Sequence, residues 1–427
     1  MAHSEEASLP HIYSTTNRAE SDPSFQESPS PRHPVRKSAV RMWAGVAIVL
    51  CIGCGLFYAL YKVATGAQQA VDDSAAAGAI VPSPAELKYS YGIAAGGSLP
   101  ELTDAQLDAR MKAIAASGAK WVRFDFKWSE IQPDNAKSYK WDVYDKLVRT
   151  AQKYNLYILG ILDFTPTWAR SSACPDTDKC APANNAQFAQ FAKTVSNRYK
   201  NRGLHYWEVW NESNSPQFWQ PKADAKAYTD LLKRTYTAIH TEDKNAVVMT
   251  AGPSPYDTTD ESYSPVDFLT AIYANGGKGY FDAVGAHPYT FPITPKNTAE
   301  HAWYQMASTT DGMRAVMVKN GDANKKIWIT EFGSPTGGPG EVSSIEDPNL
   351  EAKPYVVTED LQAKILSDAV DLYRSYDWVG PFMYYSYQDA GNTPDTNENY
   401  FGLVRYDGSK KPAYTTFQTA TKNVLTQ

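Results

Sequence analysis

Two glutamates stand where side chains could do chemistry together. Glu212 ends the stretch YWEVWNE and Glu331 ends KIWITE, so each directly follows an aromatic-rich segment of the kind that forms a buried strand. Two carboxyl groups that face each other can break a glycosidic bond, because one protonates the departing oxygen while the other meets the developing oxocarbenium ion. A single Glu at a strand end is usually a solvated loop residue or a helix cap. This chemistry therefore requires a fold that brings both residues to one cleft.

The pattern of the chain from Lys88 onward supplies such a fold. β-rich segments alternate with helical patterns, which predicts an α/β fold of repeated βα units around a parallel sheet. Helical patterns such as DAQLDARMKAIAASG have a predicted cap at Thr103 and a predicted stop at Gly118. Eight units predict a (β/α)8 TIM barrel, whereas a doubly wound sheet would not usually require eight strands and no Gly-rich nucleotide turn follows the first one. The expected strands are residues 89–94, 121–126, 156–162, 206–210, 246–252, 281–287, 326–332 and 382–387.

Active sites of such barrels lie at the C-terminal ends of the strands. Glu212 follows the fourth expected strand and Glu331 the seventh, so both can lean over one central cleft. Three tryptophans near this end are candidate stacking platforms for a sugar ring, although each is equally compatible with packing in the barrel or its loops. The candidate substrate-binding residues are Arg123, Asn211, His287, Tyr289, Tyr385 and Tyr387, with Trp128, Trp168 and Trp219 as the platforms.

Four motifs resemble one group of enzymes. WNE after the fourth strand, HPY after the sixth, ITEFG after the seventh and the closing FGLVRYDGSKKPAY resemble the clan A glycoside hydrolases. WEVWNESN with its following FW most resembles family 39, which contains β-xylosidases, α-iduronidases and exopolysaccharide-cleaving hydrolases. The resemblance covers about residues 88–415. It implies a retaining glycoside hydrolase with Glu212 as the general acid/base, protonated at the start of the cycle, and Glu331 as the nucleophile.

The resemblance also implies roles for the neighbouring side chains. Asn211 is placed like the residue that hydrogen-bonds the sugar 2-hydroxyl, and a strand-end cap is its alternative role. Arg123 and Tyr289 would stabilise the ionised nucleophile Glu331. His287 would orient the nucleophile or bind a sugar hydroxyl, and its alternative is a buried histidine bonded to the backbone.

The sequence departs from the family pattern at one position. Ser213 follows Asn211 and Glu212, where the family commonly has proline, so we expect a looser loop after the acid/base residue. Two alternative functions stay open: a glycan-binding or envelope-assembly protein that keeps the barrel without turnover, and a transglycosylase that passes the same intermediate to a sugar instead of water.

The segments before the barrel predict a membrane anchor. Residues 1–41 are rich in Ser, Pro and Glu without apolar periodicity, which is typical of a disordered tail. Residues 42–63 contain an uncharged apolar run of about 20 residues, which predicts a transmembrane helix, with a cleaved signal peptide as the alternative. Basic residues before this run predict a cytoplasmic N-terminus. Residues 64–87 then form a linker, and residues 88–427 form a hydrolase domain outside the cell membrane.

Charge and cysteines complete these expectations. The net charge of -6 and the pI near 5.7 come without a dense basic patch, which argues against nucleic acid as a partner. Cys174 and Cys180 bracket a polar loop, for which an oxidising compartment favours a disulfide, whereas Cys51 and Cys54 lie in the apolar run as packing residues. No ligand cluster has metal-binding spacing, so we expect no metal and no cofactor. The expected partner is a cell-envelope or extracellular polysaccharide.

Overall fold

The computed structural model describes residues 87–171, 174, 177–297, 301–347 and 355–422. The expected tail (1–41), the expected membrane helix (42–63) and all but the last residue of the expected linker (64–87) lie outside the described residues. Within the described ranges, no helix is both long enough and apolar enough to cross a bilayer.

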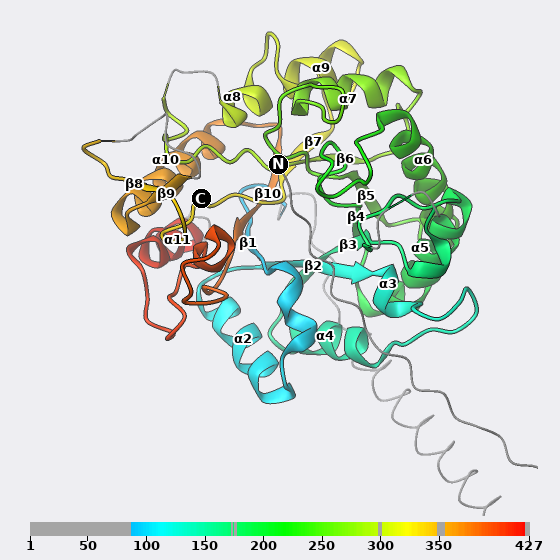
Figure 1. Cartoon of the computed structure of the whole chain (residues 1–427), viewed down its shortest axis with the longest axis horizontal. Coiled ribbons are helices and arrows are strands. Elements are labelled where there is room, and N and C mark those ends of the chain that lie inside the picture. Colours follow the sequence, from blue (N-terminus) through cyan, green and yellow to red (C-terminus); the bar gives the residue numbers. More distant parts are fainter. Residues whose placement is uncertain (1–86, 172–173, 175–176, 298–300, 348–354, 423–427) are drawn as a thin grey trace, which may run out of the picture. The chain divides into compact units, whose positions relative to one another are not determined.

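Eight parallel strands close into a barrel, with helices arranged around them (Figure 1). Along the chain each barrel strand pairs with the next barrel strand, β7 with β10 included, and β1 closes the barrel by pairing with β10 from Tyr91 against Phe382 to Ala94 against Tyr385. The (β/α)8 barrel predicted from the sequence is therefore confirmed. The strands are β1 (Tyr91–Ala94), β2 (Trp121–Lys127), β3 (Tyr157–Asp163), β4 (Tyr206–Val209), β5 (Val247–Thr250), β6 (Ala283–Ala286), β7 (Lys326–Ile329) and β10 (Val379–Tyr385).

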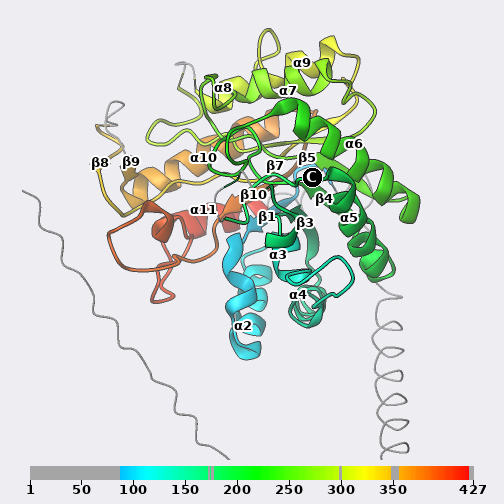
Figure 2. The same ribbon diagram turned by 45° about the vertical axis from the view of Figure 1, so that its right-hand side comes forward.

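The helices cover the outside of the barrel, with α5 beside α6 and α10 beside α11 (Figure 2). A small parallel pair, β8 (Glu341–Ser343) and β9 (Tyr355–Val357), lies in the connection after β7. The α-helices are α2 (Asp104–Ala116), α3 (Trp128–Ile131), α4 (Asp142–Lys153), α5 (Asn185–Tyr199), α6 (Ala225–Glu242), α7 (Pro265–Ala274), α8 (Ala302–Ala307), α9 (Met313–Lys319), α10 (Glu359–Ser375) and α11 (Pro412–Lys422). Short 3-10 helices are η1 (Gly96–Glu101), η2 (Thr167–Ala169), η3 (Lys200–Arg202) and η4 (Asn397–Tyr400).

Helix α2 begins and ends where its sequence predicts. The side chain of Thr103 accepts from the backbone N–H of Gln106, and the Gln106 side chain bonds back to the backbone N–H of Thr103, which forms a capping box. Gly118 follows the helix with φ +94°, a left-handed conformation that glycine adopts without strain. A Cβ at Gly118 would lie 2.0 Å from Oγ1 of Thr421 on α11, so the absence of a side chain also lets the last helix pack there.

The lower interior of the barrel is filled by a separate layer of apolar side chains. Three large aromatic residues, Trp121, Tyr206 and Trp328, are joined in this layer by smaller apolar side chains from the other strands, as is usual for a packed barrel core. Trp121 packs edge-on against Tyr206 and Trp328, with ring centroids 4.8 and 5.3 Å away. The layer consists of Ala94, Trp121, Leu159, Tyr206, Met249, Ala283, Trp328 and Met383.

Candidate active site

The polar side chains of the site stand one step above this apolar layer. Side chains on a strand alternate between its two faces, so the residue two positions further along points to the same side. Arg123 follows Trp121 by this step on β2, Glu208 follows Tyr206 on β4, and Thr330 follows Trp328 just after β7. On the inward face of these strands, the apolar layer is therefore followed directly by polar side chains, two residues further along each strand.

Glu208 is the deepest acidic group of the site and has no solvent exposure. Its Oε2 accepts from Nε of Arg123 at 2.7 Å, while its Oε1 accepts from the backbone N–H of Gly252 at 2.8 Å and from Thr330 Oγ1 at 3.2 Å. The sequence analysis missed Glu208. The available signal was a single charge in the middle of the otherwise aromatic and apolar strand YWEVW, where a charged side chain must face inward to a partner or outward to water.

Arg123 uses the rest of its guanidinium to connect three strand ends. Besides Glu208, Nη1 donates to Oε1 of Glu331 at 2.5 Å and Nη2 donates to Oδ1 of Asn211 at 2.8 Å. A planar guanidinium fixes the directions of all its donors. Arg123 therefore holds Asn211 and Glu331 in one orientation relative to each other.

Glu331 is held in its ionised form. Tyr289 donates its hydroxyl to Oε2 of Glu331 at 2.7 Å, opposite the contact with Arg123. Burial alone would raise the pKa of Glu331, but the charges of His287 and Arg123 and the hydrogen bonds from Tyr289 and Arg123 outweigh burial and hold that pKa below its usual range. Glu331 is therefore a carboxylate at neutral pH.

Glu212 has a different partner from Glu331. Nδ1 of His287 lies 2.9 Å from Oε1 of Glu212 and 3.6 Å from Oε2 of Glu331, so the buried ring lies between the two carboxyl groups. Burial would lower the pKa of His287, whereas the charge of Glu331 and the hydrogen bond with Glu212 raise it above its ordinary value.

Glu212, His287 and Glu331 form a compact cluster in which one side-chain oxygen or nitrogen of each lies within 4.8 Å of the others. Across the described residues this is the one acidic and histidine cluster with the spacing to hold a metal ion. The oxygens of Glu331 already accept from Arg123 and Tyr289, so we interpret the cluster as a reacting pair of carboxyls with a bridging histidine. Two carboxyl groups at this close separation suit direct attack on a sugar, since the inverting geometry leaves room for a water between them.

The backbone around Glu212 is strained. Trp210 and Glu212 have φ of +71° and +44°, in the left-handed region that bulky L-residues rarely adopt. Such conformations cost about 1–3 kcal/mol each and persist where the surrounding structure imposes them, often at functional sites. Gly252 contributes in another way, because a Cβ there would lie 2.4 Å from Cδ2 of His287. The left-handed backbone thus places the Glu212 side chain beside His287, and the absence of a side chain at Gly252 makes room for the imidazole ring of His287.

A comparison with known families decides the affiliation of this barrel. The family described as cellulase (glycosyl hydrolase family 5) matches residues 92–353, more than half of the chain. The chain belongs to this family. It is therefore a clan A glycoside hydrolase, as the motifs indicated. Among curated proteins, no significant match was found.

Solved structures share the fold of this family 5 chain. A family 39 glycoside hydrolase from the gut symbiont Bacteroides cellulosilyticus WH2 has a TM-score of 0.59 at 20% identity, with 81% of this chain and 66% of that chain covered. The family 39 enzyme of Xanthomonas axonopodis pv. citri has a TM-score of 0.54 at 21% identity, with 77% and 65% covered. The GH5_18 protein of Streptomyces cattleya, in complex with GlcNAc, has a TM-score of 0.58 at 16% identity, with 79% and 82% covered. The chain thus spans just under two thirds of the two family 39 structures, and at these identities the likeness shows the barrel fold alone.

Two of the three predicted stacking tryptophans of the family 5 chain lie in the core. Trp128 has no exposed surface and packs between Trp168, Phe188 and Phe191. Trp219 is 2% exposed and packs against Trp210. Their ring faces are covered, so the structure corrects the prediction that Trp128 and Trp219 form stacking platforms. Trp168 is only partly buried and donates its indole N–H to the carbonyl of Gln132 at 2.7 Å, which leaves it as the one candidate platform of the three.

The two tyrosines predicted after the last strand lie in different places. Tyr385 donates its hydroxyl to Oε2 of Glu398 at 3.1 Å. Burial raises the pKa of Glu398, and the charges of Glu331 and Glu212 raise it further. The sequence analysis missed Glu398. Tyr387 contacts Arg110 instead, whose guanidinium carbon lies over the tyrosine ring, 5.7 Å from the ring centre.

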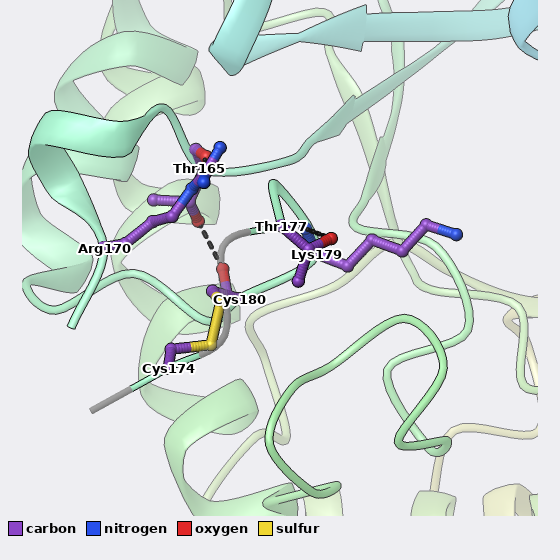
Figure 3. The surroundings of a disulfide bond; sticks show 6 residues. All are labelled: Thr165, Arg170, Cys174, Thr177, Lys179 and Cys180. Atoms are coloured by element: carbon purple, nitrogen blue, oxygen red, sulfur yellow. Dashed lines mark hydrogen bonds between the residues drawn. A yellow bond between two sulfur atoms is a disulfide. The ribbon is translucent and has the colours of Figure 1, made fainter. Parts of the chain in front are cut away.

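The predicted disulfide between Cys174 and Cys180 is present, which confirms that prediction (Figure 3). Thr165, just after β3, donates its hydroxyl to the carbonyl of Cys180 at 2.6 Å and so fastens this loop to the mouth of the barrel. In Figure 3, the side chain of Lys179 points away from the disulfide. The other two cysteines, Cys51 and Cys54, lie outside the described residues.

The loop after Glu212 is fastened despite the missing proline. Asn214 is completely buried, and its side-chain amide donates to the carbonyls of Ser254 and Tyr263, both at 2.8 Å. The backbone N–H of Ser215 also donates to the carbonyl of Glu212 at 3.0 Å. These bonds restrain the loop after Ser213, which the sequence analysis expected to be loose.

Proposed function

We propose that this chain is a retaining glycoside hydrolase that works by double displacement, with Glu331 as the nucleophile and Glu212 as the general acid/base. The observation that carries the proposal is the asymmetry of the two facing glutamates. Arg123 and Tyr289 keep Glu331 ionised, whereas among the described residues the His287 ring is the only basic partner of Glu212. A nucleophile and a proton donor need these two different settings.

In the first step, Glu212 gives its proton to the glycosidic oxygen while Glu331 attacks the anomeric carbon from the opposite face. The bond to the leaving group breaks and a bond between the sugar and Glu331 forms. In the second step, Glu212 takes a proton from water, the water attacks the anomeric carbon, and Glu331 is released. Two inversions retain the configuration of the sugar.

Asn211 and His287 support these steps. Because Oδ1 of Asn211 accepts from Arg123, its amide NH₂ is the end that can donate to a sugar hydroxyl, in agreement with the expected contact to the 2-hydroxyl. His287 lies between both carboxyl groups and holds Glu212 near the scissile bond. The charge and hydrogen bonds that stabilise the transition state are thus in place before the substrate arrives.

We further propose a glycan of the cell envelope or the extracellular matrix as the substrate. The support is the apolar run at residues 42–63 with its preceding basic residues, which would anchor the barrel at the outer surface of the cell membrane. The disulfide between Cys174 and Cys180 agrees with an oxidising compartment. Solved structures that share this fold include a monomeric β-xylosidase of Caulobacter crescentus CB15 and a variant of the Streptomyces cattleya GH5_18 protein in complex with Manβ1-4GlcNAc.

The test is product analysis with the full chain and a panel of envelope and extracellular polysaccharides. Mass spectrometry should detect oligosaccharides released by the wild type. Glu331→Gln should lower the rate by about 10⁴-fold or more and Glu212→Gln by about 10²- to 10⁴-fold. Glu101→Gln, an exposed glutamate on η1, is the matched control and should leave the rate unchanged.

Three results would separate the alternatives. Release of product by Glu331→Gln at the wild-type rate would contradict its role as nucleophile. Proton NMR of the first product should show the retained anomer, and an inverted anomer would exclude double displacement. Longer oligosaccharides than those supplied would identify transglycosylation at the same site.

A further inference from the structure

The β2 and β3 side of the barrel mouth carries two acidic residues that the proposed reaction does not use. Asp125 lies two residues beyond Arg123 on β2, and Asp163 ends β3 in register with Lys127. Phe124, Phe126 and Leu162 point outward into the layer between strands and helices, so the alternate residues Asp125 and Asp163 point inward. Both carboxyl groups therefore face the inside of the barrel mouth.

Asp163 is completely buried, and neither of its side-chain oxygens has a hydrogen-bond partner. A buried polar group without a partner costs about 1–3 kcal/mol, so native proteins rarely retain one without a purpose. Burial raises the pKa of Asp163 well above its usual range, and the charge of Asp125 raises it further. Burial also raises the pKa of Asp125, to about 6, against the lowering effect of Arg123 and Lys127. Both carboxyl groups therefore hold a proton to higher pH than an ordinary aspartate does.

The exposed residue Gly97 lies beside the side chains of Asp125 and Lys127. A Cβ built on the exposed residue Gly97 would lie 3.6 Å from Oδ2 of Asp125 and 3.6 Å from Nζ of Lys127. A single point above Gly97 is therefore close to an acidic acceptor and a basic donor at once. The ammonium of Lys127 uses one donor on Glu130 at 2.9 Å, which leaves its others available.

We propose that Asp125 and Lys127, which both lie close to the exposed backbone of Gly97, form a sugar-hydroxyl subsite of the catalytic cleft beside the buried Asp163 of β3. A sugar hydroxyl both donates and accepts, so one hydroxyl can donate to Asp125 while it, or its neighbour on the ring, accepts from Lys127. The inference rests on the proposed function, and it adds the substrate class: a neutral glycan with a free pair of adjacent hydroxyls.

The charges around the subsite favour a neutral sugar over an acidic one. An anionic substituent would meet Asp125 directly and would also approach Glu130, which already accepts from Lys127. A cation would be repelled by Lys127 and by Arg123, whose charge also acts on Asp125. A hydroxyl pair carries no charge and satisfies both groups.

The test compares three single variants of the full chain. Asp125→Asn removes the charged acceptor, and Gly97→Ala adds a methyl group at ordinary van der Waals distance from both side chains, so that the fold is preserved. Ser98→Ala, at the next exposed position of η1, is the control. Each variant is measured twice: for kcat and KM on any polysaccharide that the wild type cleaves, and for affinity in the inactive Glu331→Gln background by calorimetry with cellopentaose, xylopentaose and mannopentaose.

We expect Asp125→Asn to raise KM or Kd by about 10- to 100-fold, the usual effect of losing a hydrogen bond to a charged group. Gly97→Ala should raise it by about tenfold with kcat nearly unchanged, and Ser98→Ala should match the wild type. Cleavage with an unchanged KM in both variants would overturn the subsite while the hydrolase function stands. Binding that Asp125→Asn weakens, without any cleavage by the wild type, would support the subsite and contradict the function. Failure of the inactive chain to bind any of the three oligosaccharides would overturn the subsite.

Discussion

On the β4, β6 and β7 side of the barrel mouth, each central carboxyl group has a partner, whereas Asp163 on the β2 and β3 side has none. Arg123 reaches across from β2 to pair with both Glu208 and Glu331, and His287 faces Glu212. The charged and hydrogen-bonding partners of Glu331 lower its pKa, whereas burial raises the pKa of Asp163. A carboxyl group is thus held ionised where cations and hydrogen-bond donors outweigh burial, and it holds its proton more tightly where burial outweighs the nearby charges.

Removal of the Arg123 charge should cause the largest loss of stability. Arg123→Met leaves Glu208 buried with no opposite charge, so the free energy of unfolding should fall by about 3–5 kcal/mol. Urea unfolding followed by tryptophan fluorescence measures this loss. The double variant Arg123→Met/Glu208→Met removes the stranded charge together with its partner and should recover most of the stability. An equal loss in the single and double variants would show that the buried pair is not what stabilises this side.

The raised pKa of Asp125 should make the folded chain less stable as the pH rises, whereas a carboxylate in a salt bridge has the opposite effect. Since the pKa of Asp125 is about 6 in the folded chain and about 4 in an unfolded one, the folded state holds its proton to higher pH and loses stability as the pH rises from about 4 to 6. Asp125→Asn should remove about 1–3 kcal/mol of that loss. Urea unfolding of both chains at pH 4, 5, 6 and 7 measures the difference. The exposed Asp134→Asn should follow the wild type, and an Asp125→Asn chain that does so too would contradict the raised pKa.

The smallest expected effect concerns the hydrogen bond from Tyr289 to Glu331. Tyr289→Phe removes one hydrogen bond from ionised Glu331, so the pKa of Glu331 should rise. If Glu331 is the nucleophile, the acid limb of kcat/KM should move to higher pH by about 0.5–1 unit. The pH profile is the measurement, and Tyr304→Phe, at an exposed tyrosine on α8, is the control. An acid limb that stays in place would mean that a group other than Glu331 sets it.

Much of the barrel could be predicted because its signals are local. β-rich segments, helical patterns and the Thr103 cap are properties of short stretches, and the eight strands were found with shifts of a few residues at their ends. The positions of Glu212 and Glu331 at strand ends followed from the same reasoning, since all strand ends of a parallel barrel meet at one face.

Contacts across the barrel could not be predicted in the same way. Glu208 acquires its role only because β2 and β4 are in a register that brings it to Arg123. The burial of Asp163 without a hydrogen-bond partner could not be predicted, because it depends on everything packed around that side chain. Trp128 and Trp219 were assigned to the sugar because composition does not reveal which ring faces other aromatics cover. Register and packing are long-range properties, which a short stretch of sequence does not contain.

The pairing of β1 with β10 also has a consequence for how the chain is made. Tyr91 pairs with Phe382, so one edge of β1 has no partner until about 290 further residues have been synthesised. At about 5–20 residues per second, that interval lasts about 15–60 s. During this time β1 presents unpaired backbone groups at the rim of an unfinished sheet, which is the kind of edge that invites aggregation. The short length of β1, with only four residues, limits this exposure while the ribosome completes the barrel.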